Sequence, residues 1–367
     1  MTNVANNSVI RTIAKFLNRF QGRTTRPVLS ACLAVFMGCS LCLVSATVQA
    51  GPVLDAIKKR DAVRCGVSSG VAGFSAVGSD GQWRGLDVAV CRAVAAAVLG
   101  SAQKVEFTPL TSQQRFAALQ AGQIDILSRN TTWTLSRDAG LNAHFAAITY
   151  YDGQGILMHK RFGVKSASEL NGAEICVQSG TTNEKNLTTY LGTQGIKAKA
   201  IVYDNFEAAY KAFFSGRCQA FSTDVSALIG LKSKQSDKPD DYVVLPEIFS
   251  KEPLGPAVQR GDDEFFAIVK WVVFAMIEAE ELGVGQANIE QALKNKNPAV
   301  QRLLGGAEDL GKPLGLPRNW VATVLKQVGN YGEVFEANLG QQSPLKLKRG
   351  LNALWTQGGL MYAPPLR

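Results

Sequence analysis

Short apolar runs alternate with longer amphipathic stretches through the first part of the chain. The runs 63–67, 104–109 and 124–127 predict buried strands, and the stretches 86–99 and 112–121 predict helices, the first with one apolar face. Strands that alternate with helices indicate an α/β fold. Ligands of such folds bind beyond the carboxyl ends of the strands, so the loops after these strands are candidate binding loops.

The alternation starts again after an apolar and aromatic run at 148–158, which predicts a long strand leaving the first unit. The predicted elements of the second unit are the strands 174–178, 200–203, 218–222 and 243–245 and the helices 183–191, 205–215 and 225–231. Segment 250–255 predicts a return to the first unit, and the apolar helix 262–281 and further helices follow. The pattern therefore predicts two α/β units with two crossings between them.

The first 50 residues have the composition of a secretory signal peptide. Five basic residues and no acidic residue precede an apolar run at 28–44, and the small-x-small triplet Val48-Gln49-Ala50 follows. The alternative is a transmembrane anchor, for which the run is short. We expect cleavage after Ala50, and therefore a periplasmic protein.

The mature chain of 317 residues has room for two domains. Its net charge falls from +9 to +4 when the five basic residues of the leader are removed. No basic run with interleaved aromatic residues is present, so nucleic acid is not an expected partner. The small positive excess is compatible with an anionic or zwitterionic ligand.

Four cysteines remain after cleavage, and an even number in an exported protein indicates disulfides. Of the three possible pairings we favour the two local pairs, Cys65 with Cys91 and Cys176 with Cys218. No CxxC or histidine-rich spacing is present, so we expect neither a metal site nor a cofactor.

Candidate binding groups follow predicted strands in both units. The stretch 122–138, GQIDILSRNTTWTLSRD, places Arg137 after a loop rich in hydroxyls and amides, which suits a carboxylate. The alternative is a solvated loop with a helix cap at Thr134 and a surface arginine. In the second unit, Ser179-Gly180-Thr181-Thr182 could hold an anion at a helix start, and Asp224 could meet an ammonium. Both could instead be ordinary helix caps.

Several of these pieces occur in an order that resembles a known family. They are the loop 68–74, WRGLDVAVCRAVA, IDILSRNTTWTLSRD, YYDGQGILM, QSGTTNE and FSTD. The chain resembles the extracytoplasmic solute-binding proteins of bacterial ABC importers for amino acids. Its C-terminal part, with VGNYGEVFEANLG, resembles the branch that binds many L-amino acids.

The resemblance implies a two-lobed periplasmic-binding-protein fold of type II, with two crossing strands as the hinge. Lobe 1 is expected to comprise 51–153 and 255–367, and lobe 2 to comprise 154–254. The resemblance also implies that Arg137 binds the ligand's α-carboxylate and that Asp224 pairs with the α-ammonium. Asn130 and Thr132 match the loop positions that meet the ligand's ammonium and carboxylate with backbone and side-chain groups. Thr182, with Thr181 beside it, matches the second lobe's carboxylate donor.

Specificity is indicated by two positions of the first loop. Narrowly specific members of the family carry an acid where this chain has Ser68 and an aromatic where it has Val71, so we expect broad specificity. Trp133 is either a wall of the ligand site or packing beneath the loop. Arg115 and Arg129 could favour acidic side chains, but we expect both at the surface.

The resulting hypothesis is a monomeric binding protein that delivers L-amino acids to the membrane permease subunits of an ABC importer. A dehydratase on the same scaffold is the first alternative. It needs a general acid or base, and neither His144 nor His159 lies in a cleft motif. A ligand-sensing domain of a receptor is the second alternative.

Overall fold

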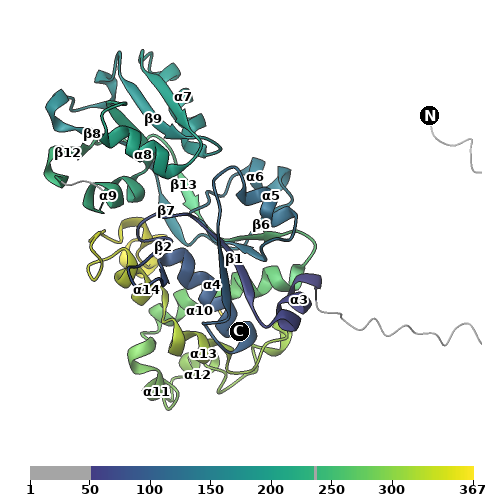
Figure 1. The fold of residues 1–367 in the computed structure, drawn as a ribbon. Helices are drawn as coiled ribbons and strands as arrows, with labels where there is room; N and C mark the ends of the chain where they lie inside the picture. The colour runs from purple at the N-terminus through teal and green to yellow at the C-terminus, as the bar shows by residue number, and fades with distance from the viewer. Residues whose placement is uncertain (1–50, 235–237) are drawn as a thin grey trace, which may run out of the picture. The chain divides into compact units, whose positions relative to one another are not determined.

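The computed structural model describes residues 51–234 and 238–367 (Figure 1). The predicted signal peptide and its cleavage after Ala50 lie outside the described residues. None of the described helices is long and apolar enough to cross a membrane.

The first five-stranded sheet has the order β4-β1-β5-β14-β6. Its strands are β1 (Val63–Val67), β4 (Val105–Pro109), β5 (Ile126–Leu127), β6 (Ala143–Phe145) and β14 (Ala257–Gln259). Strands β4, β1 and β5 are parallel, and β14 runs antiparallel to β5 and β6. Helices α4 (Leu86–Leu99) and α5 (Arg115–Gln120) form the crossovers that parallel pairing requires. The alternation in the sequence therefore predicted β1, β4 and β5, although β5 is shorter than the apolar run 124–127. It did not predict β6 and β14.

The second five-stranded sheet has the order β10-β9-β11-β8-β12. Its strands are β8 (Gln154–His159), β9 (Glu174–Gln178), β10 (Lys199–Tyr203), β11 (Ala220–Asp224) and β12 (Tyr242–Val244). Its helices are α7 (Thr182–Thr193), α8 (Phe206–Phe214) and α9 (Val225–Lys234). Strands β9, β10 and β11 are parallel, so the carboxyl ends of β9 and β11 meet at one edge of this sheet.

Two short strands lead from one sheet to the other and back. Strand β7 (Tyr150–Asp152) pairs antiparallel with β13 (Glu252–Leu254), and the two lie side by side in Figure 1. The predicted long strand 148–158 is divided between β7 and β8 at Gly153. A Cβ at Gly153 would lie 2.2 Å from the Ile248 side chain, so the close approach of the chain there requires glycine. The two predicted crossings are thus present as a pair of antiparallel strands.

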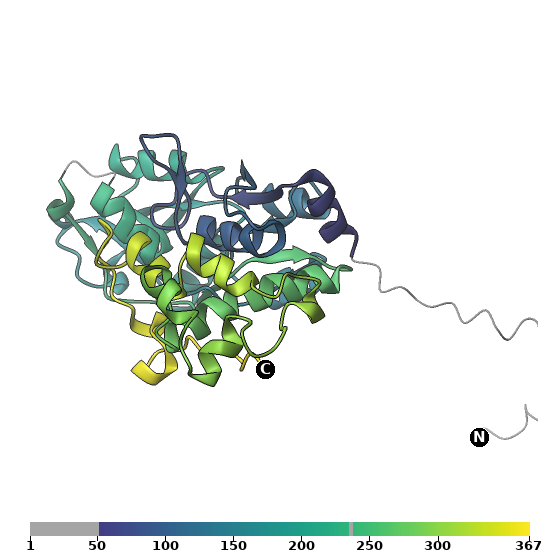
Figure 2. The same cartoon turned by 90° about the horizontal axis from the view of Figure 1, so that it is seen from below.

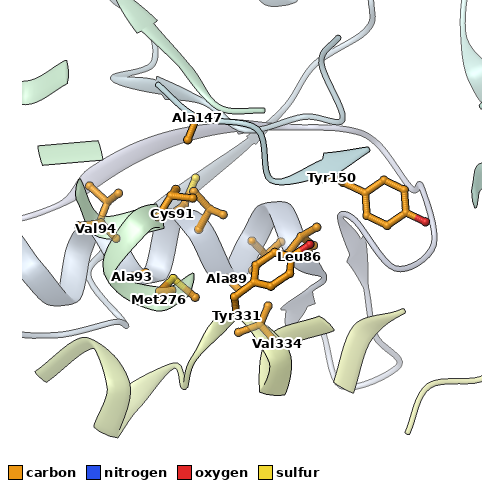
Figure 3. Close-up of a cluster of buried hydrophobic side chains, with 14 of the residues drawn as sticks. Leu86, Ala89, Cys91, Ala93, Val94, Ala147, Tyr150, Met276, Tyr331 and Val334 are labelled. Atoms are coloured by element: carbon orange, nitrogen blue, oxygen red, sulfur yellow. The ribbon is translucent and has the colours of Figure 1, made fainter. Parts of the chain in front are cut away.

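The C-terminal helices cover the first sheet together with α4. They are α10 (Asp263–Glu281), α11 (Ile289–Ala292), α12 (Pro298–Leu303), α13 (Trp320–Gln327) and α14 (Tyr331–Asn338). In Figure 2 these green to yellow helices lie against the blue α4, and Figure 3 shows Met276 and Tyr331 beside α4 residues such as Leu86 and Val94. Helix α4 is buried on nearly every side, so the prediction of a single apolar face was too narrow.

The remaining short elements complete the first unit. They are α3 (Pro52–Arg60), α6 (Leu135–Gly140), β2 (Ala76–Val77) and β3 (Trp83–Arg84). Two disulfides hold the two sheets separately. Cys65–Cys91 joins β1 to α4, and Cys176–Cys218 joins β9 to the turn before β11. These are the two local pairs that the sequence favoured.

Candidate ligand-binding site

The loop after β5 is shaped by a buried carboxylate on α4. Asn130 has a left-handed φ of 36°, which is uncommon for a residue other than glycine. Its backbone N–H donates to Asp87 Oδ2 at 2.7 Å, and Ser128 Oγ donates to Asp87 Oδ1 at 3.2 Å. Burial raises the pKa of Asp87 to about 6, and these hydrogen bonds oppose the rise. Asp87 therefore holds the loop that carries Asn130 and Thr132.

The loop before α7 brings two threonines to the start of the helix. Thr181 caps it, because its Oγ1 accepts from Glu184 N at 3.1 Å and donates to Gln178 O at 2.7 Å. The Thr182 hydroxyl lies 3.3 Å from the Thr132 hydroxyl of the first unit. The structure thus brings Thr132 and Thr182 together, whereas the Thr181 hydroxyl is engaged in capping.

Asp224 ends β11 with a buried side chain. Its Oδ1 accepts from Asn183 Nδ2 at 2.8 Å, and only 4% of the residue is exposed. Burial raises the pKa of Asp224 well above its usual value, and repulsion from Asp152 and Glu252 adds to the rise. The Asn183 hydrogen bond and the charge of Arg137 act in the opposite direction. A cation that reached this carboxylate would stabilise its charged form.

Three arginines are buried near the same place. Arg115, Arg129 and Arg137 are 3%, 4% and 8% exposed, so the expectation that Arg115 and Arg129 lie at the surface was wrong. Arg115 Nη2 reaches Gly180 O of the second unit at 3.4 Å, and Arg129 Nε donates to Leu110 O at 2.9 Å. Burial of Arg115 depends on this loop of the other unit, which no local pattern reveals.

Arg137 lies between its own loop and an aromatic ring. Its Nη1 donates to Thr132 O at 2.9 Å, and its guanidinium lies 5.7 Å from the centre of the Phe116 ring. Within the described part of the chain, neither Arg137 nor Arg115 nor Arg129 forms an ion pair with a carboxylate. Burial without such a partner is costly, which makes the three arginines candidates for binding an anion.

The pKa values of the arginines reflect this crowding. Burial lowers the pKa of Arg115 well below its usual value, and the charges of Arg137 and Arg129 lower it further. Burial lowers the pKa of Arg129 to about 10, against the attraction of Asp87. It also lowers the pKa of Arg137, although Glu252 and Asp224 oppose the shift. An added negative charge would relieve the repulsion among the three guanidinium groups.

A small cavity of about 20 Å³ lies between these groups. The residues that line it are Val71, Ser112, Arg115, Arg129, Asn130, Thr132, Gln178, Thr181, Thr182, Asn183, Phe206, Thr223 and Asp224. Three buried atoms of its wall lack a hydrogen-bond partner among the described residues, namely Ser112 Oγ, Arg115 Nε and Asn130 Oδ1. Native structures leave few such atoms, so the wall retains hydrogen-bonding capacity for a polar ligand.

Three candidate residues, Arg137, Ser68 and Trp133, do not line this cavity. Ser68 Oγ lies 2.6 Å from Ser75 Oγ and accepts from Val71 N at 3.3 Å, so it shapes the loop whose Val71 reaches the cavity. Trp133 stacks on Phe145 with ring centres 5.6 Å apart. Of the two alternatives for this residue, the structure therefore favours packing beneath the loop over a wall of the ligand site.

Sequence reasoning missed other residues around the cavity. Ser112, Gln178, Asn183, Phe206 and Thr223 line it. Their positions near strand ends or helix starts were a signal, but many polar residues share such positions. Asp87 and Glu252 act behind the wall, and the sequence contains no signal for either.

Comparison with known proteins identifies the class. Residues 63–286 match the bacterial extracellular solute-binding proteins, family 3, and the chain belongs to this family. The fold is the two-lobed type II fold of periplasmic binding proteins, with two crossing strands between the lobes, as predicted.

The particular relatives are matched over almost their whole length. The general L-amino acid-binding periplasmic protein AapJ of Rhizobium johnstonii is 49% identical over 91% of this chain and 98% of its own. The glutamate/glutamine/aspartate/asparagine-binding protein BztA of Rhodobacter capsulatus is 47% identical over 91% and 99%. An ABC transporter periplasmic binding protein from Brucella ovis, solved with glutathione bound, has a TM-score of 0.84 at 47% identity and covers 86% of this chain and 99% of its own.

These relatives are named as binding proteins, and none of the three is named as an enzyme. The chain is accordingly an extracellular solute-binding protein of this family.

Proposed function

We propose that the protein binds L-amino acids in the periplasm and delivers them to the permease subunits of an ABC importer. The observation that carries the proposal is a pair of opposite buried charges, one from each unit. Arg137 lies on α6, which follows β5 of the first sheet, and Asp224 ends β11 of the second. Both are buried, and neither forms an ion pair within the described residues.

A zwitterion can satisfy both charges at once. The guanidinium of Arg137 binds the α-carboxylate, and Asp224 pairs with the α-ammonium. Because each charge belongs to a different lobe, a ligand with both groups stabilises the closed arrangement more than the open one. Asn130, Thr132 and Thr182 supply further hydrogen bonds at the cavity wall. The names of AapJ and BztA, which describe amino-acid binding, support this assignment.

The finer specificity follows from the two additional buried arginines. Arg115 and Arg129 line the cavity and add positive charge to that of Arg137, to which we assign the α-carboxylate. We expect broad recognition of L-amino acids, with preference for side chains that end in a carboxylate or a carboxamide. The acidic and amide amino acids in the name of BztA agree with this expectation.

Calorimetric titration of the mature protein tests the proposal. The panel contains the twenty L-amino acids, their D-isomers, α-keto acids and glutathione. Arg137→Ala should reduce L-amino acid affinity by about 100-fold, because it removes one partner of a buried charge pair. Arg161→Ala, at an exposed arginine of the second unit, is the matched control and should bind as the wild type does. Undiminished affinity in Arg137→Ala would contradict the role given to Arg137, and a reaction product would favour an enzyme.

The lobe boundaries and the cellular location complete the proposal. Lobe 1 comprises 51–153 and 255–367, and lobe 2 comprises 154–254. The leader 1–50 is removed on export, and the mature protein is a monomer. Intact mass of protein from the periplasmic fraction checks the cleavage site, and light scattering after size-exclusion chromatography checks the monomer.

A further inference from the structure

Glu252 of β13 is a buried carboxylate that contacts both sides of the candidate site. It is 1% exposed. Its Oε2 accepts from Thr132 Oγ1 at 2.5 Å and from Thr182 Oγ1 at 2.8 Å. Its Oε1 accepts from Asn186 Nδ2 and Ser250 Oγ, both at 2.7 Å. Four hydrogen bonds thus fix the carboxylate, and two of them come from threonines that line the cavity.

The two threonine hydroxyls have their hydrogens committed to Glu252. A hydroxyl has one hydrogen to donate and lone pairs with which to accept, and an ionised carboxylate can only accept. Thr132 and Thr182 therefore donate to Glu252, although their oxygens lie only 3.3 Å apart. Each hydroxyl can therefore act only as a hydrogen-bond acceptor toward a molecule in the cavity.

We propose that Glu252 is a positioning residue of the ligand site, which orients the Thr132 and Thr182 hydroxyls as acceptors for the ligand's ammonium group. This inference rests on the proposed function. It adds a reason why the site would bind an amino acid more tightly than an otherwise similar acid without an ammonium group. Glu252 does not itself line the cavity and acts through the two threonines.

The number of acceptors matches the chemistry of the ligand. A primary ammonium has three N–H donors. Asp224, Thr132 and Thr182, which all line the cavity, provide three acceptors. A 2-hydroxy acid offers one O–H donor at the same position and a 2-keto acid offers none. With these ligands the oriented threonine oxygens remain unsatisfied, which costs free energy in a buried site.

The same contacts connect the two sheets. Thr132 follows β5 of the first sheet and forms an isolated bridge with Leu254 of β13, whereas Thr182 begins α7 beside the second sheet. Glu252 lies on a crossing strand between them. Its hydrogen bonds therefore form where the loop after β5 meets the start of α7, so the acceptors are correctly placed only when these two elements approach each other.

Glu252→Gln tests the proposal because it keeps the shape of the side chain but introduces an N–H donor. In one orientation the amide donates to a threonine, which must then turn its hydrogen elsewhere. We expect the affinity for L-glutamate to fall by about tenfold or more, as expected for loss of a hydrogen bond to a charged group. The affinity for 2-hydroxyglutarate should change by less than about threefold. The ratio of the two affinities is the measured quantity, and a general loss of structure would not lower it selectively.

A second variant series shows whether Glu252 acts through the threonines. In a Thr132→Val, Thr182→Val background, Glu252→Gln should have little further effect on the ratio. Each single valine variant should itself lower the ratio, which keeps the test available if Glu252→Gln fails to fold. Glu207→Gln, at an exposed carboxylate on α8, is the matched control.

Four results would count against the role of Glu252 or against the proposed function. Equal weakening of both ligands by Glu252→Gln would overturn the proposal, as would a full effect in the valine background. A wild-type protein that binds no L-amino acid would instead overturn the proposed function itself. If Glu252→Gln keeps the wild-type ratio of the affinities for L-glutamate and 2-hydroxyglutarate, the proposed function stands and only the role of Glu252 is excluded.

Discussion

Replacing Asp224 with asparagine should weaken ligand binding and stabilise the ligand-free protein at the same time. The two side chains have the same shape, and the asparagine oxygen can still accept from Asn183, which donates to Asp224 Oδ1 at 2.8 Å. The substitution therefore removes the ability to carry a negative charge and little else. The affinity and the free energy of unfolding should move in opposite directions, which distinguishes a functional charge from a structural one.

The size of the binding effect follows from burial. Asp224 is 4% exposed, so a ligand ammonium beside it would be largely shielded from water. Removing one partner of a buried charge pair costs about 3 kcal/mol, which corresponds to about 150-fold in affinity. Ligands without an ammonium, such as 2-hydroxy acids, should lose much less.

The effect on stability follows from the raised pKa of Asp224. Burial and repulsion from Asp152 and Glu252 raise this pKa above that of the unfolded chain. The folded protein then binds more protons than the unfolded chain between the two pKa values, so its stability falls as the pH rises through that interval. Each tenfold shift in such an equilibrium is about 1.4 kcal/mol, and the asparagine variant avoids the loss. At neutral pH the free energy of unfolding of the asparagine variant should therefore be higher than that of the wild type.

Titration calorimetry with L-glutamate and urea unfolding of the ligand-free protein measure the two quantities. Asp241→Asn, at a less buried carboxylate of the second unit, serves as the control. Unchanged affinity for L-glutamate would refute the pairing of Asp224 with the ammonium. A lower free energy of unfolding would show that the charge of Asp224 stabilises the fold, contrary to the reasoning from burial.

Three further predictions concern the same molecule. Because a bound ammonium lowers the raised pKa of Asp224, binding should release a proton, and affinity should fall by at most tenfold per pH unit as the pH is lowered. Titrations in buffers of different ionisation enthalpy measure the proton release, and its absence at every pH tested would contradict the prediction. Arg115→Met should lower the affinity for L-glutamate about tenfold but the affinity for L-leucine less than about threefold. Equal changes for the two ligands in calorimetry would show that the Arg115 guanidinium does not bind the side chain of the ligand. Replacing Cys176 and Cys218 with serine should lower the free energy of unfolding, measured in urea, by about 4 kcal/mol, since the disulfide spans 42 residues. A change below about 1 kcal/mol would mean that loss of the disulfide adds little conformational entropy to the unfolded chain.

Much of the secondary structure could be predicted because its causes are local. The apolar runs of β1 and β9 and the apolar periodicity of α4 give their observed bounds. The long run at 148–158 misled, because the strand is divided at Gly153, where the chain packs closely against Ile248, a residue far away in the sequence. Apolar periodicity reports which residues prefer burial, but it does not report where the chain must bend around a distant neighbour.

The candidate site divides in the same way. Arg137 and Asp224 were found because both come near the carboxyl ends of predicted strands, and that rule is topological. The burial of Arg115 could not be predicted, because its Nη2 meets Gly180 across 65 positions of sequence. The packing of Trp133 on Phe145 was one of two open alternatives, and only the position of β6 decides between them.

The sequence by itself determined the two α/β units, the family resemblance and the presence of one cation and one anion at strand ends. These depend on residue type and on spacing along the chain. Tertiary structure alone decided that Thr132 and Thr182 share the carboxylate of Glu252, from which they are 120 and 70 positions away. Side chains form hydrogen bonds with the groups that the fold brings close to them. A glutamate on a crossing strand therefore differs from a surface glutamate only through the groups that surround it.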